Sequence, residues 1–432
     1  MAQVNNILWI VATVCLICCG LFYTFKLHFV QFNVKKMINS LKNESKRKNA
    51  ISPFKTLSLS LAARIGVGSL AGIALGLYQG GVGVIFWIWV SAFITIPNSF
   101  VESTLAVIYH EKDGKYFKGG PAYYIKHGLG FKKLSILYAI IISFCYLGGF
   151  LAIQSNTISR CLFDYANVPM ILTGIIIAII SYIIISHGLS RISTFTSLLV
   201  PIMGIFYMII AVGIIIFNID KIPAIFSSIL EEAFNIKAFG WGIISSIIIG
   251  VQRGIFSSEA GIGTGAVASG ISETNNPCSQ GYIQMIGVYF TSFIVCTSTA
   301  MLILTSDVDI SSFINPNGIE ITLRALQNHL GIFGTISLIF LVISFAFSTI
   351  VSGYYYGESN IKYLYKNINY SGIKVLHIIA VVILLLGAII TPSFLWSIID
   401  LGVALLAIIN TIAIFMLRED VFKELGEKND RK

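Results

Sequence analysis

Long apolar stretches recur along the chain, separated by short polar segments, and several contain no charged residue. Most approach 20 residues, the length that an α-helix needs to cross a hydrocarbon core about 30 Å thick. The apolar residues are continuous rather than alternating, so they predict helices and exclude a transmembrane β-barrel. We therefore expect eleven transmembrane helices, at residues 7–25, 53–78, 82–109, 134–158, 168–186, 193–217, 239–268, 281–305, 333–356, 373–391 and 393–417.

The composition supports this interpretation. Of the 432 residues, 56% are hydrophobic and 11% are charged, whereas a soluble protein has about 25% charged residues. So few charges cannot cover the surface of a soluble protein, which excludes a soluble enzyme, a nucleic-acid binder and a disulfide-rich secreted domain. The seven cysteines show no metal-binding spacing. The expected fold class is an all-α polytopic membrane protein.

The distribution of basic residues predicts the orientation. No Lys or Arg precedes the first helix and a basic cluster follows it, which argues against a cleavable signal peptide and places the N-terminus outside. Most other Lys and Arg lie in segments that are then cytosolic, at 26–55, 110–133, 360–374 and in the C-terminal tail. The net charge of +9 therefore reflects topology in a lipid bilayer, and nucleic-acid binding has no support. With eleven spans the C-terminus is cytosolic.

Beyond the first helix, ten helices form two sets of five with opposite orientation. Each set begins with a span that glycines interrupt near its middle. Interrupted spans at corresponding positions of two inverted halves predict a transporter site at the midplane. Alternatively, glycines four residues apart form a packing face for a neighbouring helix. The interrupting glycines are Gly66, Gly68, Gly72 and Gly76 in the first half and Gly254, Gly261, Gly263 and Gly265 in the second.

This symmetry predicts how the chain is organised. An extra transmembrane helix (1–30) and a basic cytosolic loop (31–52) precede two repeats of five helices. The first repeat covers 53–218, and the inverted second repeat covers 219–417. A cytosolic tail (418–432) follows.

Ionisable residues within the spans are costly and are candidates for function. Arg64 lies about 16 Å into its helix, near the midplane, and we expect Glu259 of the opposing broken span to be its anionic partner. This pair is either structural or involved in transport. For Glu102 and Asp400 we expect hydrogen bonds to helix ends rather than contact with a substrate. Hydroxyl pairs such as Ser348 and Thr349 either bind an ion or bond back to their own helix.

Two motifs identify a family resemblance. They are Gly-Gly-Pro-x-Tyr-Tyr-Ile at 119–125 and Arg-Gly-x-Phe-Ser-x-Glu-Ala-Gly-x-Gly at 253–263. Over nearly its whole length the chain resembles the alanine/glycine:cation symporters, which are amino-acid permeases of bacterial and archaeal cell membranes. The resemblance implies a LeuT-type inverted-repeat fold with an extra N-terminal helix, and inward transport of alanine or glycine with sodium.

The resemblance also implies site residues. Gly66 and Gly68 match the unwound first core helix, where the substrate carboxylate is expected. The sodium ligands would be the carbonyls of Ala62 and Ile65 with the hydroxyls of Ser348 and Thr349, which is suitable oxygen chemistry for a hard cation. The other implied substrate-binding residues are Ser69, Gln154, Asn156, Ser257, Ser258, Gly261 and Gly263, and the chain has no expected catalytic residue.

Several positions depart from the family pattern, among them Val67 in place of a second Thr and Ser258 in place of an Asn. Arg64 and Ser69 stand where a Thr and an Asn are expected, and Asn98 stands where a Lys is expected. Position 64 borders one of two sodium sites in this fold, so we hypothesise that the Arg64 guanidinium replaces that sodium. Alternatively, Arg64 contacts the substrate carboxylate and admits an acidic amino acid, which competition by aspartate and glutamate would test.

The sequence thus predicts a secondary transporter for a small neutral amino acid that works by alternating access with sodium. Because of Arg64, proton-coupled or uncoupled transport of an altered substrate is the alternative, with the proton in place of sodium. A non-transporting membrane sensor of the same fold is a more remote alternative. The substrate's identity, the stoichiometry and the oligomeric state are left open by the sequence.

Overall fold

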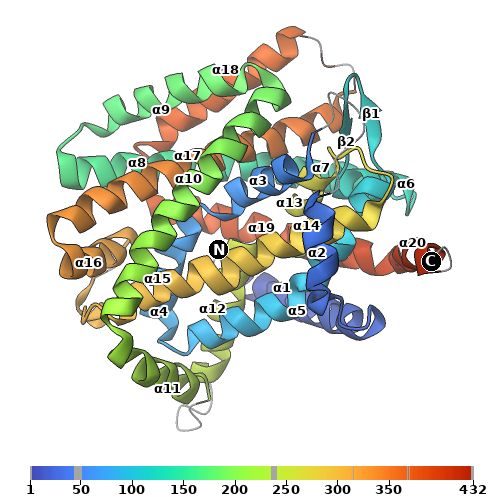
Figure 1. Cartoon of the computed structure of the whole chain (residues 1–432). Helices are drawn as coiled ribbons and strands as arrows, with labels where there is room; N and C mark the ends of the chain where they lie inside the picture. Colours follow the sequence, from blue (N-terminus) through green and yellow to red (C-terminus); the bar gives the residue numbers. More distant parts are fainter. Residues whose placement is uncertain are drawn as a thin grey trace.

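The computed structural model describes residues 2–42, 51–234, 241–314, 316–366, 368 and 370–429. Most of the described chain is helical (Figure 1). The first half contains α1 (Ala2–Lys26), η1 (Val30–Phe32), α2 (Val34–Lys42), α3 (Pro53–Arg64), η2 (Val67–Ser69), α4 (Ala71–Gly80), α5 (Val84–Ile108), β1 (Glu111–Asp113), β2 (Tyr116–Lys118), α6 (Pro121–His127), α7 (Lys132–Ser143), η3 (Phe144–Phe150), α8 (Leu151–Ala166), α9 (Met170–Ile185) and α10 (Gly188–Phe217).

The second half continues the helical architecture. Its elements are η4 (Ile219–Lys221), α11 (Ile222–Ala233), α12 (Trp241–Ser258), α13 (Thr264–Ser269), α14 (Pro277–Tyr289), η6 (Phe290–Cys296), α15 (Thr297–Leu304), η7 (Ile310–Ser312), α16 (Ile319–Leu330), α17 (Ile332–Leu364), α18 (Tyr370–Gly387), α19 (Pro392–Met416) and α20 (Arg418–Asn429). The segments η3 and η6 are π-helical, and each continues directly into the α-helix that follows it.

The described residues contain eight continuous helices that are long and apolar enough to span a membrane. A ninth candidate is the pair formed by α3 and the segment 67–80, which is bent by 61° at a short break. Each of the eleven expected segments coincides with one or more helices, although the start of the seventh, at residue 239, lies outside the described residues. A multi-pass membrane protein is therefore shown, and the number of eleven spans stays a prediction.

Several polar segments contain structure that the hydrophobic pattern did not predict. The expected basic loop contains α2, whose Met37 is buried and which packs against α14; residues 43–50 of that loop lie outside the described part. A two-stranded antiparallel hairpin pairs Glu111 with Lys118, a small exception to an all-α fold. The expected tail contains α20. These short elements are amphipathic or turn-forming, so a search for apolar runs of 20 residues does not detect them.

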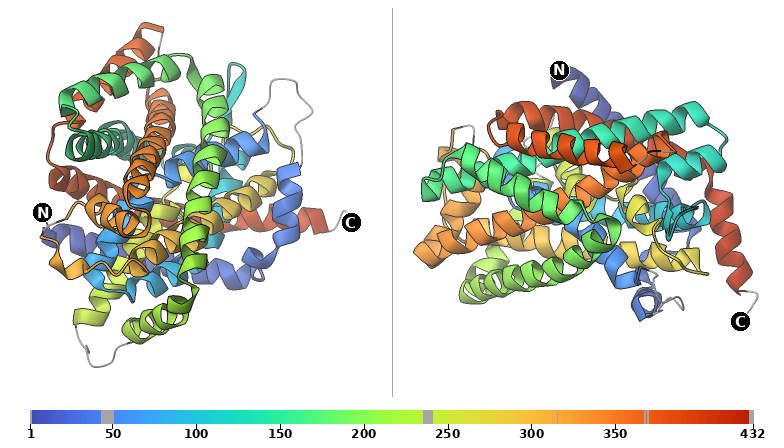
Figure 2. Two further views of the ribbon diagram at one scale, coloured as in Figure 1. Left: turned by 60° about the vertical axis from the view of Figure 1, so that its left-hand side comes forward. Right: turned by 90° about the horizontal axis from the view of Figure 1, so that it is seen from above.

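The long helices form two packed groups (Figures 1 and 2). One group contains α5, α12 and α14, with α1 packed on α5 and α19. The other contains α8, α9, α17 and α18. The two broken spans lie between them, because α3 contacts both α14 and α17, and α13 contacts both α5 and α17. The helix α10 passes across α3 and α17 on one face.

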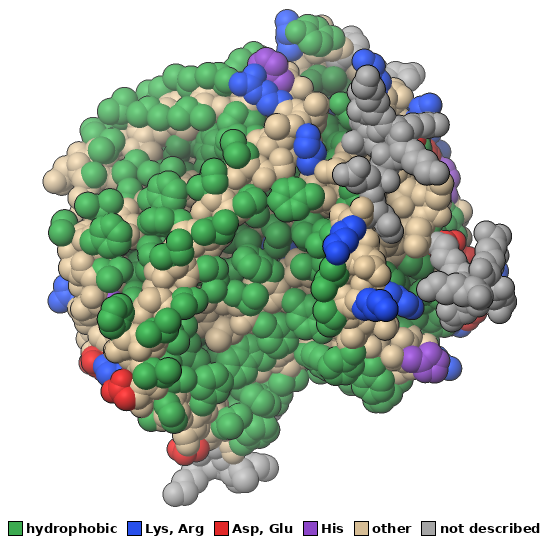
Figure 3. Space-filling view, viewed as in Figure 1, with side chains coloured by type: hydrophobic (Ala, Val, Ile, Leu, Met, Phe, Trp, Pro, Cys, Tyr) green, Lys and Arg blue, Asp and Glu red, His purple; other side chains and the backbone are tan. Residues whose placement is uncertain are grey.

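The outer surface is largely apolar, as a lipid-facing surface requires. Figure 3 shows a face covered mainly by hydrophobic side chains, with most Lys and Arg gathered at the upper right and most Asp and Glu at the lower left. Large apolar residues of α9 and α10 are exposed, among them Ile179, Leu198 and Ile209. Charge is thus concentrated at two ends of an apolar belt.

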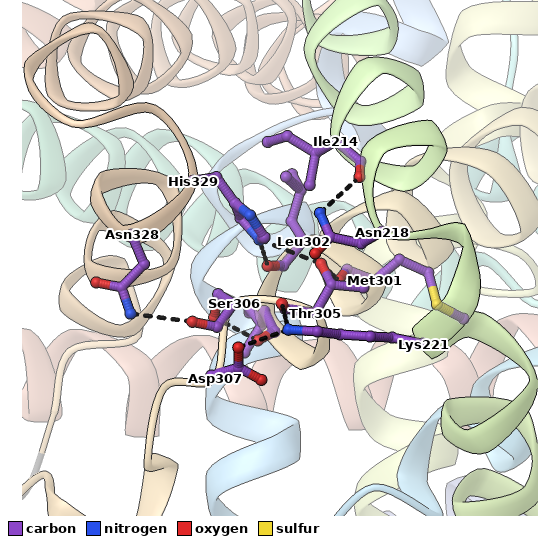
Figure 4. A network of polar contacts seen from close by, with 11 residues as sticks. Ile214, Asn218, Lys221, Met301, Leu302, Thr305, Ser306, Asp307, Asn328 and His329 are labelled. Atoms are coloured by element: carbon purple, nitrogen blue, oxygen red, sulfur yellow. Dashed lines mark hydrogen bonds and ion pairs between the residues drawn. The ribbon is translucent and has the colours of Figure 1, made fainter.

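Polar side chains close the C-terminal end of α15 (Figure 4). The Lys221 ammonium donates to the carbonyl oxygen of Thr305 at 3.1 Å, and the Asn328 amide donates to that of Ser306 at 3.0 Å. Carbonyl groups at a helix C-terminus have no partner within the helix, and a cation there is favourable. The network therefore fixes α16 and η4 to the end of α15.

His329 gives this network a dependence on pH. Its Nε2 lies 3.1 Å from the carbonyl oxygen of Leu302. Burial lowers the pKa of His329 below its ordinary value of 6.5, and Lys221 adds to this, while the bond to Leu302 opposes it. The folded state therefore binds the proton less readily than the unfolded state, so its stability falls as the pH falls through the ordinary histidine range.

We expect the melting temperature of the purified protein to fall less in His329→Gln than in the wild type when the pH is lowered from about 7.5 to about 5.5. Glutamine keeps a donor for the Leu302 carbonyl and cannot become charged. His28→Gln, on an exposed turn after α1, controls for the loss of an imidazole. An equal fall in His329→Gln and the wild type would contradict the assignment.

Candidate functional site

The first break separates α3, which ends at Arg64, from α4, which begins at Ala71. The backbone groups freed there are bound by side chains of other helices. The Val67 amide donates to Gln154 Oε1 at 3.4 Å, and Thr299 Oγ1 donates to the carbonyl oxygen of Ser69 at 2.8 Å. The break therefore lies where glycines predicted it, and Gln154 reaches it as expected.

The two predicted glycines of this break have different surroundings. A Cβ on Gly66 would lie 2.5 Å from Thr349 Oγ1 and 3.5 Å from Gln154 Nε2, so a side chain is excluded. A Cβ on Gly68 would meet no atom within 4 Å. Gly66 thus permits a close approach of α17 to the break, and Gly68 borders open space ahead of the α4 N-terminus.

The residues of the predicted sodium site come together beside Gly66. Ser348 Oγ and Thr349 Oγ1, both on α17, donate to the carbonyl oxygen of Ala62 at 3.1 Å and 3.0 Å. Ile65 caps α3 with φ −87° and ψ 68°, which turns its carbonyl out of the helical direction. Three oxygens from two helices therefore converge at the end of α3, a donor set that suits a hard monovalent or divalent cation.

The second break runs from Glu259 to Gly263, between α12 and α13. All three of Glu259, Gly261 and Gly263 have positive φ, at 52°, 87° and 92°. Gly263 N donates to Glu102 Oε2 at 3.1 Å, and Asn410 Nδ2 donates to the carbonyl oxygen of Gly261 at 2.9 Å and to Glu102 Oε2 at 2.7 Å. The expectation that Glu102 binds a helix end is confirmed, since Gly263 caps the N-terminus of α13.

The extra helix α1 supports this second break. A Cβ on Gly261 would lie 2.4 Å from Leu16 Cδ2, so glycine is required both for φ and for space. Asn98, where the family pattern has a Lys, donates from Nδ2 to the carbonyl oxygen of Leu16 at 3.0 Å. Trp9 stacks on Phe256 of α12. The N-terminal helix therefore packs directly against the broken segment.

The expected ion pair between Arg64 and Glu259 is not formed. Glu259 Oε1 accepts from the Tyr146 hydroxyl at 2.5 Å, and Oε2 accepts from Thr264 Oγ1 at 2.9 Å. Arg64 Nη1 instead donates to the carbonyl oxygen of Gln284 on α14 at 3.0 Å. The prediction was wrong because it inferred proximity from depth in the membrane, whereas the rotation of α3 turns the guanidinium towards α13 and α14.

The Arg64 guanidinium is buried in a polar space over Gly265. Its Nε and Nη2 have no hydrogen-bond partner among the described residues, and the same is true of Glu102 Oε1 and Gln284 Oε1. A Cβ on Gly265 would lie 2.6 Å from Arg64 Nη2, 3.5 Å from Glu102 Oε1 and 3.6 Å from Gln284 Oε1. The carboxylate that faces Arg64 is thus that of Glu102. The space between these groups exists because Gly265 has no side chain.

Serine hydroxyls join the two breaks. Ser69 Oγ lies 3.2 Å from Ser257 Oγ, which in turn lies 2.9 Å from Cys296 Sγ in the π-helical segment η6. Ser258 Oγ accepts from the Ala260 amide at 3.3 Å, so it serves the local backbone. The structure therefore places Ser69 and Ser257 together, whereas Ser258 binds the backbone of its own break.

Asn156 is directed away from the first break. Its Nδ2 donates to the carbonyl oxygens of Gly387 at 3.0 Å and Ile390 at 2.7 Å, which fastens α8 to the end of α18. Residues two apart on a helix do not share a face, and the Asn156 amide does not join Gln154 at the Val67 amide. Asn156 does line a small cavity of about 20 Å³ together with Val67.

Sequence reasoning missed Tyr138, Tyr146 and Asn410. Tyr138 donates to the carbonyl oxygen of Ile262 at 2.6 Å, so all three side chains hold the second break. A single Asn within the apolar span of α19 is the one signal that could have been read, because amides are rare there. Tyr138 and Tyr146 could not be recognised from the sequence, because the chain contains many aromatic residues.

Comparisons with known proteins identify the family of the chain. The model of the Sodium:alanine symporter family matches residues 1–432. The amino-acid carrier protein AlsT of Bacillus subtilis is 36% identical over 421 residues, with 97% of this chain and 89% of the carrier covered. A probable sodium/glutamine symporter of the same organism, GlnT, is 35% identical, with 99% and 90% covered.

The fold is similar to that of a solved transporter. The crystal structure of MhsT in complex with L-phenylalanine superposes with a TM-score of 0.63 at 14% identity, and covers 85% of this chain and 89% of that one. This likeness shows a LeuT-type fold, in agreement with the two helix breaks. On the match over its full length, the chain belongs to the sodium:alanine symporter family, whose members are transporters and not enzymes.

Proposed function

We propose that this protein imports a small neutral amino acid, alanine or glycine, together with sodium by alternating access. The observation that carries the proposal is the convergence of Ser348 and Thr349 on the Ala62 carbonyl, where α3 breaks. Sodium is the ion of the family, and its coordination by carbonyl and hydroxyl oxygens suits this arrangement.

The amino acid would bind at the first break. Its carboxylate would face the N-terminus of α4, where backbone amides and the helix dipole favour an anion. The open space beside Gly68 supports this placement. The Ser69 and Ser257 hydroxyls and the Gln154 amide would supply the remaining polar contacts.

The same geometry supports coupling. The sodium ligands would come from α17 of the second packed group and from α3, which lies between the two groups. A bound ion would therefore favour the states in which these two helices are close. An ion shifts such an equilibrium only by its difference in affinity between the states. From the distribution of basic residues we propose that the N-terminus lies outside and the C-terminus in the cytosol, in a prokaryotic cell membrane.

The function is tested by uptake of labelled L-alanine into proteoliposomes under an inward sodium gradient, an inward proton gradient or no gradient. We expect accumulation under the sodium gradient alone, with competition by unlabelled glycine. Accumulation driven only by protons would support the proton-coupled alternative. Glutamine, aspartate and glutamate as competitors test the wider substrate range; inhibition by glutamine but not alanine would contradict the proposed substrate.

The sodium site is tested with Ser348→Ala and Thr349→Val. A contact to a charged group contributes about 1.5–3 kcal/mol, so each variant should raise the sodium concentration for half-maximal uptake about tenfold or more. Ser348 and Thr349 donate to the Phe345 carbonyl of their own helix as well as to Ala62. Ser352→Ala is the matched control, because among the described residues Ser352 Oγ donates to carbonyl oxygens of its own helix alone. A sodium dependence equal to that of the wild type in both variants would refute the site.

The two glycines of the first break should respond differently to alanine. Gly66→Ala places a methyl against Thr349 Oγ1 and should weaken sodium dependence. Gly68→Ala fills open space where the substrate is expected, so it should raise the KM for alanine and leave sodium affinity unchanged. Gly72→Ala, within α4 and without an atom in 4 Å of the new methyl, is the control. A normal KM in Gly68→Ala would place the substrate elsewhere.

We further propose that the Arg64 guanidinium takes the place of a second sodium. Two cations a few ångströms apart repel each other by several kcal/mol at low effective dielectric, on the order of 4 kcal/mol at 4 Å. The measurement is the sodium:alanine ratio, from paired isotope fluxes. Arg64→Thr should raise the ratio, whereas Arg64→Lys keeps a fixed cation and should not. An unchanged sodium:alanine ratio in Arg64→Thr would refute this proposal.

A further inference from the structure

A long apolar groove opens on the outer surface between α3, α10 and the α14–η6 segment. Its volume is about 770 Å³. Apolar side chains such as Leu61, Met208 and Phe290 form its walls, and Ser58 contributes the one hydroxyl of the lining. It lies on the face shown in Figure 3, which is covered mainly by hydrophobic side chains. The groove is thus open to the hydrocarbon of the bilayer.

Small residues of α10 create the hollow. Gly204 and Gly213 both line it. A Cβ on Gly204 would meet the ring of Phe290 at 3.8 Å, and one on Gly213 would meet nothing within 4 Å. Along α10 the lining extends from Val200 to Ile216, about 24 Å at 1.5 Å per residue. This exceeds one leaflet, which is half of a hydrocarbon core of about 30 Å.

One end of the groove is basic. Lys55 follows the groove residue Phe54, and its Nζ donates to Thr194 Oγ1 of α10 at 2.9 Å. The Lys36 ammonium lies 5.8 Å from the ring centre of Tyr282, one turn before the groove residue Ile286. The helices α2, α3 and α10 contain basic residues, and none of α2, α3, α10 and α14 contains Asp or Glu. An anion at this end would therefore meet two ammonium groups and no carboxylate from these helices.

We propose that the groove binds one acyl chain of an anionic phospholipid, whose phosphate is held by Lys55 and Lys36. The apolar walls match the chain, and the basic end matches a phosphate at the headgroup level, where a Lys near the membrane surface attracts an anionic lipid. The bound chain would contact Leu57 and Leu61 of α3, the half-helix that carries Ala62. The lipid would thereby stabilise α3 against α10.

The test uses the full chain in phosphatidylcholine nanodiscs. A phosphatidylglycerol probe with a photoactivatable diazirine on one acyl chain is compared with the matching phosphatidylcholine probe, and labelled peptides are mapped by mass spectrometry. We expect the phosphatidylglycerol probe to label α3, α10 and α14 several-fold more than the phosphatidylcholine probe. Peptides of α9, an exposed apolar helix outside the groove, should be labelled equally by both probes.

Variants separate the chain from the headgroup. Gly204→Trp should fill the groove and lower labelling of α3 several-fold, with Gly213→Leu as a second filling variant and Ile179→Trp on α9 as the matched control. Lys55→Gln should lower labelling by the phosphatidylglycerol probe to the level of the phosphatidylcholine probe, and it should leave labelling by the phosphatidylcholine probe unchanged. Labelling of α3 that neither filling variant reduces would overturn the groove assignment. Equal labelling of the groove helices by both probes in the wild type would overturn the headgroup assignment.

Thermal stability gives an independent readout that does not require transport. A ligand that binds the folded protein raises its melting temperature, so added phosphatidylglycerol should stabilise the wild type in detergent more than phosphatidylcholine does. The difference should shrink in Lys55→Gln. No difference between the two lipids in the wild type would count against the proposal, whatever the outcome of the uptake experiments.

Discussion

Backbone groups cannot stay unpaired inside a bilayer, and this constraint governs the centre of the molecule. Two spans break within the helical core, after Arg64 and after Ser258, and each break frees N–H and C=O groups that need partners. At the second break Glu102, Asn410 and Tyr138 bind Gly263 N and the carbonyls of Gly261 and Ile262. The breaks persist because other helices supply these partners, and this ties α5, α7 and α19 to the site.

The two breaks are satisfied in different ways, and this gives them different roles. The second is held by a carboxylate, an amide and a tyrosine, and α1 covers Gly261 with Leu16. The first is held more lightly, through Gln154 and Thr299, and it borders open space at Gly68. A site that must bind and release a substrate is expected at the first break, which has fewer side-chain partners. The second break would then hold the neighbouring helices in place.

The buried charged side chains also differ in their surroundings between the two breaks. Glu259 accepts hydrogen bonds from two hydroxyl groups. Glu102 binds the N-terminus of α13 with one oxygen and faces Arg64 with the other. The buried guanidinium of Arg64 thus lies on the side of α13 and α14, away from the hydroxyl pair of α17. One cation site beside Ala62 can therefore coexist with Arg64, because the two lie on different sides of α3.

The sequence by itself determined the membrane class, the position of the spans and the position of both breaks. Apolar run length and glycine placement are local properties that do not depend on how helices pack. The family resemblance added the pairing of Ser348 and Thr349 with Ala62. The structure alone decided that Arg64 faces Glu102 and Gln284, that Asn156 fastens α18, and that Tyr138, Tyr146 and Asn410 hold the second break. These contacts depend on the rotation of each helix about its axis relative to its neighbours, which an apolar pattern fixes too loosely to predict.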